Sequence, residues 1–147
     1  MIDSFQGPNR FLSNFFPAPL EIGGVLYPTV EHAFAAAKTR VPEARASVIA
    51  AATPGEAKRL GRLVPLRPDW EEKKVAIMRG LVRAKFTRHA DLRARLLATR
   101  PHGLIEGNTW HDNFWGVCTC VRCYSHGGLN RLGQILIAVR TEMEALG

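Results

Sequence analysis

The sequence lacks any long hydrophobic run, and none of its segments approaches the roughly 18 apolar residues that a membrane-spanning helix needs. Its first residues, Met1–Phe5, also lack the cationic and apolar segments of a secretory signal peptide. We therefore expect no membrane span, no membrane partner and a cytoplasmic location.

Cysteine is scarce, with three residues in 147, and all three fall within six positions. This odd, crowded set excludes a secreted disulfide framework. Together with His126, the thiols of Cys118, Cys120 and Cys123 supply four candidate zinc ligands within nine residues. Zinc ligands more often come as two separated pairs. The pattern therefore favours small thiols lining a loop, and we predict no metal and no cofactor.

Acidic residues are also few: 13 against 20 lysines and arginines, which leaves a formal charge of +7. The basic residues are spread along the chain, so they do not form a basic tail. Such a balance favours phosphate-bearing partners, although a solvated, arginine-rich surface explains it as well. The length of 147 residues and the 46% hydrophobic content predict one globular domain over residues 1–147.

Local patterns predict a mainly helical chain with a small antiparallel element. Gly23-Gly24 separates two short apolar runs, Leu20–Ile22 and Val25–Tyr27, which indicates a hairpin. Thr29 can cap the helix that follows, and Thr53–Glu56 forms a capping box with proline at the first helical position. Asp69–Glu72 forms a second capping box. The fold class is therefore mainly α (α+β).

Helical periodicity places buried stripes on two later helices. We expect helices at about 29–39, 43–51, 54–61, from 70 onward (buried at Ile77, Met78, Leu81, Val82 and Phe86), 91–98 and 130–144 (buried at Leu132, Leu136, Val139 and Met143), with a brief strand at 104–106. The intervening segment from Gly107 to Gly128 is long for a connection in a compact domain, which indicates a functional loop.

Two charged residues on the first helix have a spacing that suits chemistry. Glu31 and Lys38 are seven residues apart, which returns them to within about 20° of one face. A lysine with a lowered pKa can attack a ribose carbon, while a nearby carboxylate moves protons. The alternative is that Glu31 complements the helix dipole and that Lys38 extends toward solvent at the other end. The residues alone leave both interpretations open.

The segment 106–116 gathers two tryptophans, two asparagines, a histidine and an aspartate. Tryptophan offers a flat face for a base, and Asp112 could hold a ribose hydroxyl or act as a second acid or base. The alternative is a loop packed by its own aromatic side chains, with Asp112 and Asn113 forming turns. His111 alone indicates a structural histidine rather than a catalytic one.

Taken together, these motifs resemble those of the NADAR (NAD- and ADP-ribose-associated) family, the YbiA-like N-glycosidases. The resemblance runs in order through nearly the whole chain. The matching stretches are Phe11–Pro17, Tyr27–Phe34, Ala37–Lys38, Ala57–Arg62, Asp69–Trp70, Lys73, Met78, Lys85–Phe86, Leu104–Asn108, Trp110–Asp112, Trp115–Gly116, Gly128–Gly133 and Arg140. The stretch 118–126 departs from the pattern, because many relatives carry a short glycine-rich link there.

The resemblance implies a compact helical YbiA-like domain that cleaves N-glycosidic bonds of ribosylated compounds. It implies that Lys38 acts covalently through a Schiff base and that Glu31 assists, with Asp112 as a further catalytic residue. The implied substrate-binding residues are Ser13, Asn14, Asn108, Trp110, Trp115, Gly116 and Asn130.

We predict removal of ADP-ribose from guanine, in a nucleotide or in nucleic acid, as the activity. The alternative substrates implied by the resemblance are phosphorylated ribosylamino-pyrimidine intermediates of riboflavin synthesis. A hypothesis of another class is a module that binds ADP-ribose or nucleic acid without turnover. The joint presence of Lys38, Glu31 and Asp112 argues against it, since a binder needs no amine nucleophile.

Overall fold

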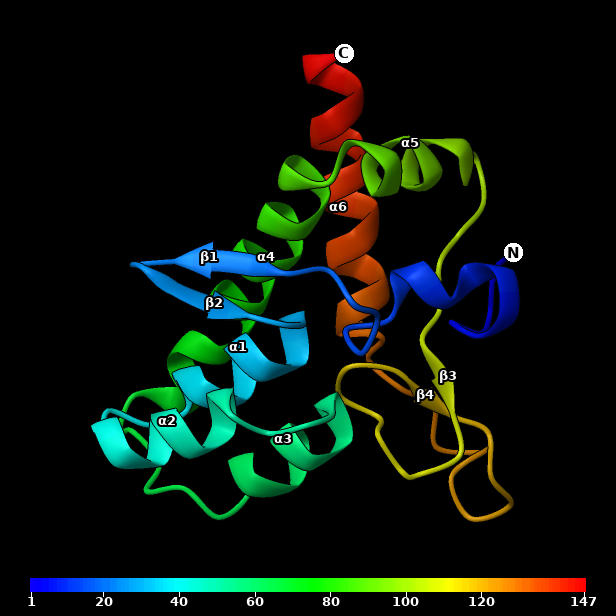
Figure 1. Ribbon diagram of the computed structural model, residues 1–147. Coiled ribbons are helices and arrows are strands. Elements are labelled where there is room, and N and C mark those ends of the chain that lie inside the picture. The colour runs from blue at the N-terminus through cyan, green and yellow to red at the C-terminus, as the bar shows by residue number, and fades with distance from the viewer. The chain divides into compact units, whose positions relative to one another are not determined.

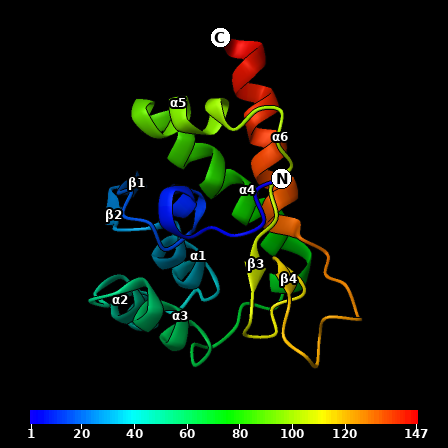
Figure 2. The same ribbon diagram turned by 90° about the vertical axis from the view of Figure 1, so that its right-hand side faces the viewer.

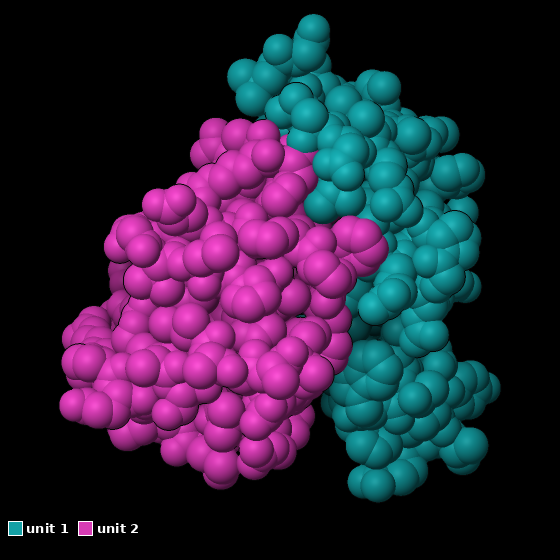
Figure 3. Space-filling model, viewed as in Figure 1, with its two compact units in different colours: residues 1–13, 90–147 teal, residues 14–89 magenta.

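The structure, a computed structural model, describes residues 1–147. Its chain forms two compact units, coloured separately in Figure 3. The central unit comprises residues 14–89, and the terminal unit comprises residues 1–13 and 90–147. Helices dominate both units, which confirms the predicted mainly helical class. The single domain over residues 1–147 stays a prediction.

The central unit contains a hairpin followed by four helices, three of them short (Figure 1). Helix α1 contacts α2, α3 and α4, so it lies at the centre of this group. The elements are β1 (Leu20–Ile22), β2 (Val25–Tyr27), α1 (Val30–Ala37), α2 (Pro42–Ile49), α3 (Pro54–Gly61) and α4 (Trp70–Arg88).

The hairpin forms as its glycine pair predicts. Strands β1 and β2 pair antiparallel, with Leu20 opposite Tyr27, and both of these side chains are buried. Gly23 and Gly24 have φ values of +58° and +80°. Two successive positive φ angles are what a two-residue turn matching the strand twist requires, and glycine adopts them without steric penalty.

Two of the three predicted helix caps are present. The Thr29 hydroxyl accepts a hydrogen bond from the backbone N–H of His32 at 3.1 Å, and α1 begins at the next residue. The Thr53 hydroxyl likewise accepts the N–H of Glu56 at 3.1 Å and begins α3. Each bond satisfies one of the backbone donors that a helix start leaves without an internal partner.

The third predicted cap is wrong. Asp69 stands immediately before α4, but its side chain makes no cap hydrogen bond. Its carboxylate instead accepts Nε of Arg67 at 2.6 Å and also pairs with Arg40 at 3.3 Å. The hydrogen bond from Arg67 is the main reason why the pKa of Asp69 is lowered to about 2. A charged partner nearby therefore outcompetes the backbone for this carboxylate.

The terminal unit joins residues 1–13 of the chain to residues 90–147. Helix α5 packs against α6, and Figure 2 shows the same neighbours from the side. The predicted inward residues of α6, namely Leu132, Leu136, Val139 and Met143, are all buried. The elements are a 3₁₀ helix η1 (Gly7–Leu12), α5 (Ala90–Ala98), β3 (Gly107–Asn108), β4 (Val117–Cys118) and α6 (Arg131–Leu146).

The predicted strand at 104–106 is misplaced. Leu104 makes only an isolated bridge with Ile2, and the strand lies next to it, at Gly107–Asn108, where it pairs in parallel with β4. The backbone N–H of Glu106 bonds to the Asn130 side chain at 3.0 Å, so a side chain replaces the ladder there. A two-residue parallel pair has too few residues to show a sequence period.

None of the helices combines the length and the apolar character that crossing a bilayer would require.

Candidate functional site

Of the predicted site residues, Asn14, Glu31 and Lys38 belong to the central unit, and the others belong to the terminal unit. Lys38 is the residue immediately after α1 and lines a pocket of about 300 Å³. The pocket walls combine charged side chains of both signs with apolar and aromatic ones, from the C-terminal end of α3, the following loop and the start of α4. These residues are Lys38, Gly61, Arg62, Val64, Leu66, Trp70 and Glu71.

The small residues of α1 allow α3 to approach closely. A Cβ atom placed on Gly61 would lie 2.9 Å from the Cβ of Ala35 and 3.6 Å from the Cδ of Lys38. The first distance is shorter than van der Waals contact, so glycine is needed at this crossing. The alanines of α1 therefore serve helix packing, and Lys38 emerges at the edge of that contact.

Lys38 has the electrostatic environment of an activated amine. Burial lowers its pKa below the usual value of 10.5, and the cations of Arg62, Lys58 and Lys74 lower it further. The negative charge of Glu31 acts in the opposite direction and holds a proton on the amine. A lowered pKa increases the fraction of neutral amine, which is the nucleophilic form.

The same amine lies close to an aromatic face. Nζ of Lys38 is 6.0 Å from the ring centroid of Trp70, and Trp70 in turn packs on Phe34 of α1 with ring centroids 4.9 Å apart. Lys58 lies 5.8 Å from the ring centroid of Phe15, a side chain that is partly exposed. Cations beside aromatic rings form a surface that suits a phosphate-bearing aromatic ligand.

Glu31 is positioned through the backbone of Asn14. The N–H of Glu31 donates to the Asn14 carbonyl oxygen at 3.1 Å, which satisfies one of the open donors in the first turn of α1. The Asn14 side chain is buried and directs its Nδ2 toward the sulfur of Met78 at 3.4 Å. Two predicted site residues are thus brought together, and Asn14 acts there mainly through its backbone.

His32, beside Glu31, is a structural residue. Its imidazole is buried, with Nδ1 2.8 Å from the Thr29 hydroxyl and Nε2 3.0 Å from the carbonyl oxygen of Ala51. Both ring nitrogens therefore have protein partners. The side chain ties α1 to the segment between α2 and α3.

In the terminal unit, the predicted binding residue Asn108 holds its own loop together. Its buried Oδ1 accepts the backbone N–H groups of Trp110 at 3.3 Å and Asp112 at 3.2 Å. Its Nδ2 donates to the Asp112 carbonyl oxygen at 2.8 Å and to the Glu106 carboxylate at 3.2 Å. These bonds close the loop, so the side chain serves the backbone here.

Asp112 makes the turn that the alternative interpretation describes. Its Oδ1 accepts the N–H groups of Phe114 at 3.1 Å and Trp115 at 2.9 Å. Gly116, another predicted binding residue, passes so close to the Glu106 backbone that a Cβ would overlap the Glu106 carbonyl oxygen. Both residues have clear structural duties in this loop.

Of the remaining predicted residues in the terminal unit, Asn130 and Ser13 make hydrogen bonds that hold the backbone, whereas the two tryptophans differ in exposure. Asn130 stands before α6 at φ +51°, and its Nδ2 donates to the Leu104 carbonyl oxygen at 2.9 Å. Ser13 ends η1 through its backbone N–H. Trp110 is 50% exposed, whereas Trp115 is partly buried and packs edge-on against Phe114 at 4.8 Å between ring centroids. Of the two tryptophans, Trp110 is therefore the more accessible from solvent.

The candidate zinc ligands assemble differently from the prediction. Cys118, Cys120 and Cys123 come together, but the fourth member of the group is His111 and not His126. The backbone N–H of His126 bonds to the Cys123 carbonyl oxygen at 2.8 Å, within a turn. Closeness along the sequence suggested His126, whereas the fold brings in a histidine from the other side of β4.

Sequence reasoning gave no role to Lys85, whose side chain is only 1% exposed in α4. Its Nζ lies 5.8 Å and 5.1 Å from the ring centroids of Phe16 and Phe86. Burial lowers its pKa to about 7. The signal was available, because Lys85 follows Met78, Leu81 and Val82 on the helix stripe that is otherwise apolar.

Comparison with known proteins places the chain in a family. A sequence model of the NADAR domain matches residues 3–144. The chain belongs to the NADAR family. It is 41% identical to the N-glycosidase YbiA of Escherichia coli over 89% of this chain and 79% of that protein. It is 42% identical to an N-glycosidase of Nostoc punctiforme, over 95% and 88% of the two chains.

The fold agrees with that assignment. The NMR structure of E. coli YbiA matches with a TM-score of 0.83 and 36% identity, covering 99% of this chain and 88% of that one. The predicted enzyme class of this NADAR chain, an N-glycosidase, is confirmed by these relatives. A riboflavin biosynthesis protein of Vibrio vulnificus is 35% identical over 91% of this chain but only 35% of its own length.

Proposed function

We propose that this NADAR chain removes ADP-ribose from guanine, in a nucleotide or in nucleic acid, through a covalent intermediate on Lys38. The observation that carries the proposal is the setting of Lys38, a half-buried amine with a lowered pKa at a pocket beside Trp70. Such an amine is a nucleophile at a pH where an ordinary lysine is protonated. The proposed location is the cytoplasm.

In the proposed reaction, the neutral amine of Lys38 attacks the anomeric carbon of the ribose. The bond between that carbon and the base nitrogen breaks, and the base leaves with the electron pair and takes up a proton. The nitrogen of Lys38 gives up two protons over these steps: one balances the proton taken up by the base, and the other balances protonation of the ring oxygen as the ribose ring opens to a Schiff base. Water then adds to the imine carbon and releases the sugar and the amine, so that one water is consumed per bond cleaved.

Glu31 is the proposed proton carrier of this reaction. It lies in the first turn of α1, seven residues before Lys38, and interacts electrostatically with that lysine. Asp112 is the weaker candidate, because one of its carboxylate oxygens already accepts two backbone N–H groups. A carboxylate that receives the proton of the attacking amine can return it to the leaving base or to the ring oxygen.

The cations around Lys38 support a substrate with phosphate groups. Lys58, Arg62 and Lys74 all lower the pKa of Lys38, so they are close enough to set the local potential. Lys74 pairs with Glu71 at 2.6 Å. A diphosphate would therefore interact mainly with the charges of Lys58 and Arg62, and Trp70 offers an adjacent aromatic face. The name of the Vibrio relative favours a second candidate, a phosphorylated ribosylamino-pyrimidine of riboflavin synthesis, which has the same bond type and also carries phosphate.

Borohydride trapping tests the chemistry. The chain is incubated with ADP-ribosylated guanosine, or separately with the riboflavin intermediate, in the presence of borohydride, and the adduct is located by mass spectrometry. We expect a stable secondary amine at Lys38 with ADP-ribosylated guanosine. Lys38→Met should abolish the adduct and lower kcat at least about 1,000-fold. Lys73→Met, on the exposed face of α4, is the matched control.

Three results would contradict the proposal in part or in whole. Full turnover by Lys38→Met would exclude the Schiff base and leave direct attack by water. Turnover of the riboflavin intermediate alone would assign the second candidate substrate. Tight binding of ADP-ribosylated guanosine with no turnover of either compound would contradict the catalytic proposal and favour the binding module.

A further inference from the structure

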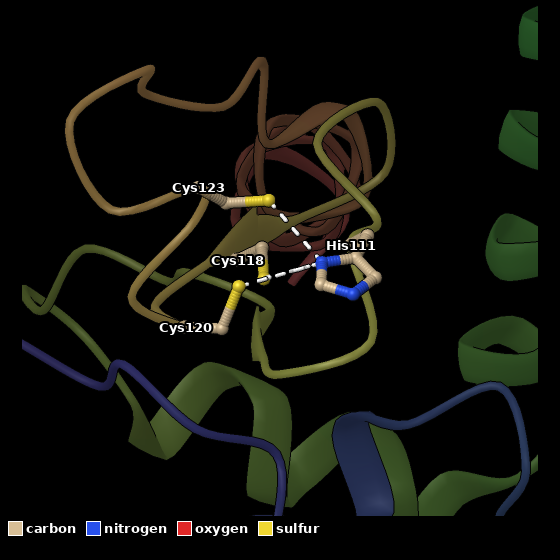
Figure 4. Close-up of side chains that lie close together, drawn as sticks. All are labelled: His111, Cys118, Cys120 and Cys123. Atoms are coloured by element: carbon tan, nitrogen blue, oxygen red, sulfur yellow. Dashed lines mark hydrogen bonds between the residues drawn. The ribbon is translucent and has the colours of Figure 1, made fainter.

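Four metal-ligating side chains converge in the terminal unit: His111, Cys118, Cys120 and Cys123. One ligand atom from each lies within 4.8 Å of all the others. Figure 4 shows the three sulfur atoms directed toward one edge of the His111 ring. We propose that this cluster binds one zinc ion and that the ion fixes the conformation of the loop 107–128.

The distances fit shared coordination better than hydrogen bonding. Nδ1 of His111 lies 3.3 Å from the sulfur of Cys123, 3.4 Å from that of Cys120 and 3.9 Å from that of Cys118. A single ring nitrogen has one proton or one lone pair, so it cannot form three hydrogen bonds at once. A tetrahedral zinc ion with ordinary bond lengths separates nitrogen from sulfur by roughly 3.6 Å. The three measured distances bracket that value.

The backbone brings the three thiols together. Cys118 and Cys120 are two residues apart on an extended segment, so their side chains share one side. That segment is held by the N–H of Thr119, which donates to the Asn108 carbonyl oxygen at 2.8 Å. The chain then turns back, because the Cys120 carbonyl oxygen accepts the N–H groups of Cys123 at 3.1 Å and Tyr124 at 2.9 Å.

His111 is held in an uncommon conformation that aims its ring at the thiols. Its φ is +70°, in the left-handed region that non-glycine residues seldom occupy. The hydrogen bonds of Asn108 to the N–H groups of Trp110 and Asp112 secure the backbone on either side. Conformations of this kind persist where the surrounding structure imposes them, which is frequent at ligand sites.

The donor set indicates a structural ion. Four protein ligands complete a tetrahedron and leave no open position for water or substrate, unlike the three-ligand sites of zinc enzymes. Cys118 is buried, whereas His111 is exposed, so an ion can reach the cluster from solvent. A closed site of this kind supplies no group to the chemistry proposed for Lys38, and its loss should affect loop stability first.

Metal content and cobalt spectroscopy test the proposal on the full chain. Protein purified under reducing conditions should contain one zinc per chain. After removal of the metal, Co²⁺ should produce the strong visible absorption of a tetrahedral thiolate site, and Zn²⁺ should displace it at one equivalent. Chelation should lower Tm. Absence of zinc together with failure to take up Co²⁺ stoichiometrically would overturn the proposal.

Matched variants locate the ligands. His111→Ala and Cys123→Ser should weaken zinc affinity at least about 100-fold, since even the loss of an outer-shell partner weakens binding 10- to 100-fold. His126→Ala, a histidine of the same loop outside the cluster, should keep one zinc per chain. Retention of zinc in both ligand variants, or its loss in His126→Ala, would contradict the assignment. If Cys123→Ser fails to fold, the wild-type cobalt spectrum decides.

The state of the thiols gives an independent measurement. In metal-free protein kept under air without reductant, a disulfide within the cluster would lower the mass by two hydrogens and remove two reactive thiols. We expect Zn²⁺ to protect all three thiols from alkylation, with one equivalent sufficient. Equal alkylation rates with and without Zn²⁺ would refute the site.

Discussion

Helix α1 and the loop 107–128, with Glu106 and Asn130 beside it, were both predicted to supply site residues, and they use their polar side chains differently. The backbone of α1 forms the regular hydrogen-bond pattern of a helix, and the Thr29 hydroxyl caps its first turn. The loop has no such repeat. There, the side chains of Asn108, Asp112 and Asn130 accept or donate bonds that backbone groups of the loop would otherwise lack.

The difference follows from the requirement that buried backbone groups find partners. Asparagine and aspartate meet it readily, because their short side chains reach backbone atoms a few residues away. A dense set of such residues in a loop is therefore evidence of loop structure before it is evidence of ligand binding. The lowered pKa of Lys38, at the C-terminal end of α1, is the more informative sign of chemistry.

The largest effect that separates the two regions should come from their carboxylates. We expect Glu31→Gln to lower kcat by about 10²- to 10⁴-fold, the usual contribution of proton transfer. Asp112→Asn keeps the oxygen that accepts the Phe114 and Trp115 N–H groups, so its kcat should change by less than about threefold. Steady-state kinetics on ADP-ribosylated guanosine measure both.

A pH profile distinguishes this role of Glu31 from a structural one. Glu31 raises the pKa of Lys38, so its neutralisation should lower that pKa further. The rise of kcat/KM with pH should then occur at lower pH in Glu31→Gln than in the wild type. An unmoved profile, or a loss in Asp112→Asn as large as in Glu31→Gln, would transfer the proton role to the loop.

Lys85 of α4 is almost fully buried, so its charge should affect the free energy of unfolding. Its pKa of about 7 in the folded chain is below the ordinary value near 10.4 in the unfolded chain. Between these values the unfolded chain binds more protons, so the free energy of unfolding should rise with pH from about 7 to 10. Below pH 7 this contribution is constant, and the full penalty is present.

Lys85→Met should therefore stabilise the chain at pH 6 to 7, by about 2 to 4 kcal/mol, and flatten the rise. Denaturant unfolding at a series of pH values gives the comparison. Lys38, whose pKa is also lowered, contributes in the same direction and remains in both proteins. Lys73→Met, exposed on the same helix, serves as the control. A Lys85→Met variant that keeps the wild-type slope would refute the pKa argument.

The loop should show its dependence on side chains as a loss of stability. Asn108→Ala removes bonds to the N–H groups of Trp110 and Asp112 and leaves those donors to find other partners. We expect a decrease of about 2 to 3 kcal/mol in the free energy of unfolding. Gln6→Ala, exposed and without a side-chain cap bond, should change it by less than about 0.5 kcal/mol.

The predictability of the two regions from sequence differs for the same reason. Caps at Thr29 and Thr53 and the turn at Gly23-Gly24 act over three or four residues, so their patterns are visible along the chain. The partners of Asn130 and His111 are set by the fold. Leu104 is 26 residues from Asn130, and the parallel strand β4 lies between His111 and two of its thiols.

The candidate site was also predicted only where its pattern lies within one helix. Spacing on α1 identified Glu31 and Lys38, but it could not show that Gly61 and Trp70 would complete the surroundings of the amine. Lys85 was visible as a charge on an apolar stripe, yet nothing in the stripe indicates how completely its neighbours would bury it. The third cap was predicted wrongly because Arg67, only two residues from Asp69, takes the carboxylate that the backbone N–H groups would otherwise bond.

The smallest effects compare two helical glycines of the central unit. Gly80 in α4 has open space where a Cβ would stand, so Gly80→Ala should stabilise the chain by about 0.5 to 1 kcal/mol through helix propensity. A Cβ on Gly61 would lie 2.9 Å from the rigid Cβ of Ala35. Gly61→Ala should therefore lower the free energy of unfolding by about 1 kcal/mol and shift α3 relative to Lys38. Thermal unfolding and kcat are measured for both variants. Only Gly61→Ala should alter turnover as well as stability. A Gly61→Ala variant as stable and active as Gly80→Ala would show that the contact between α1 and α3 does not shape the surroundings of the lysine.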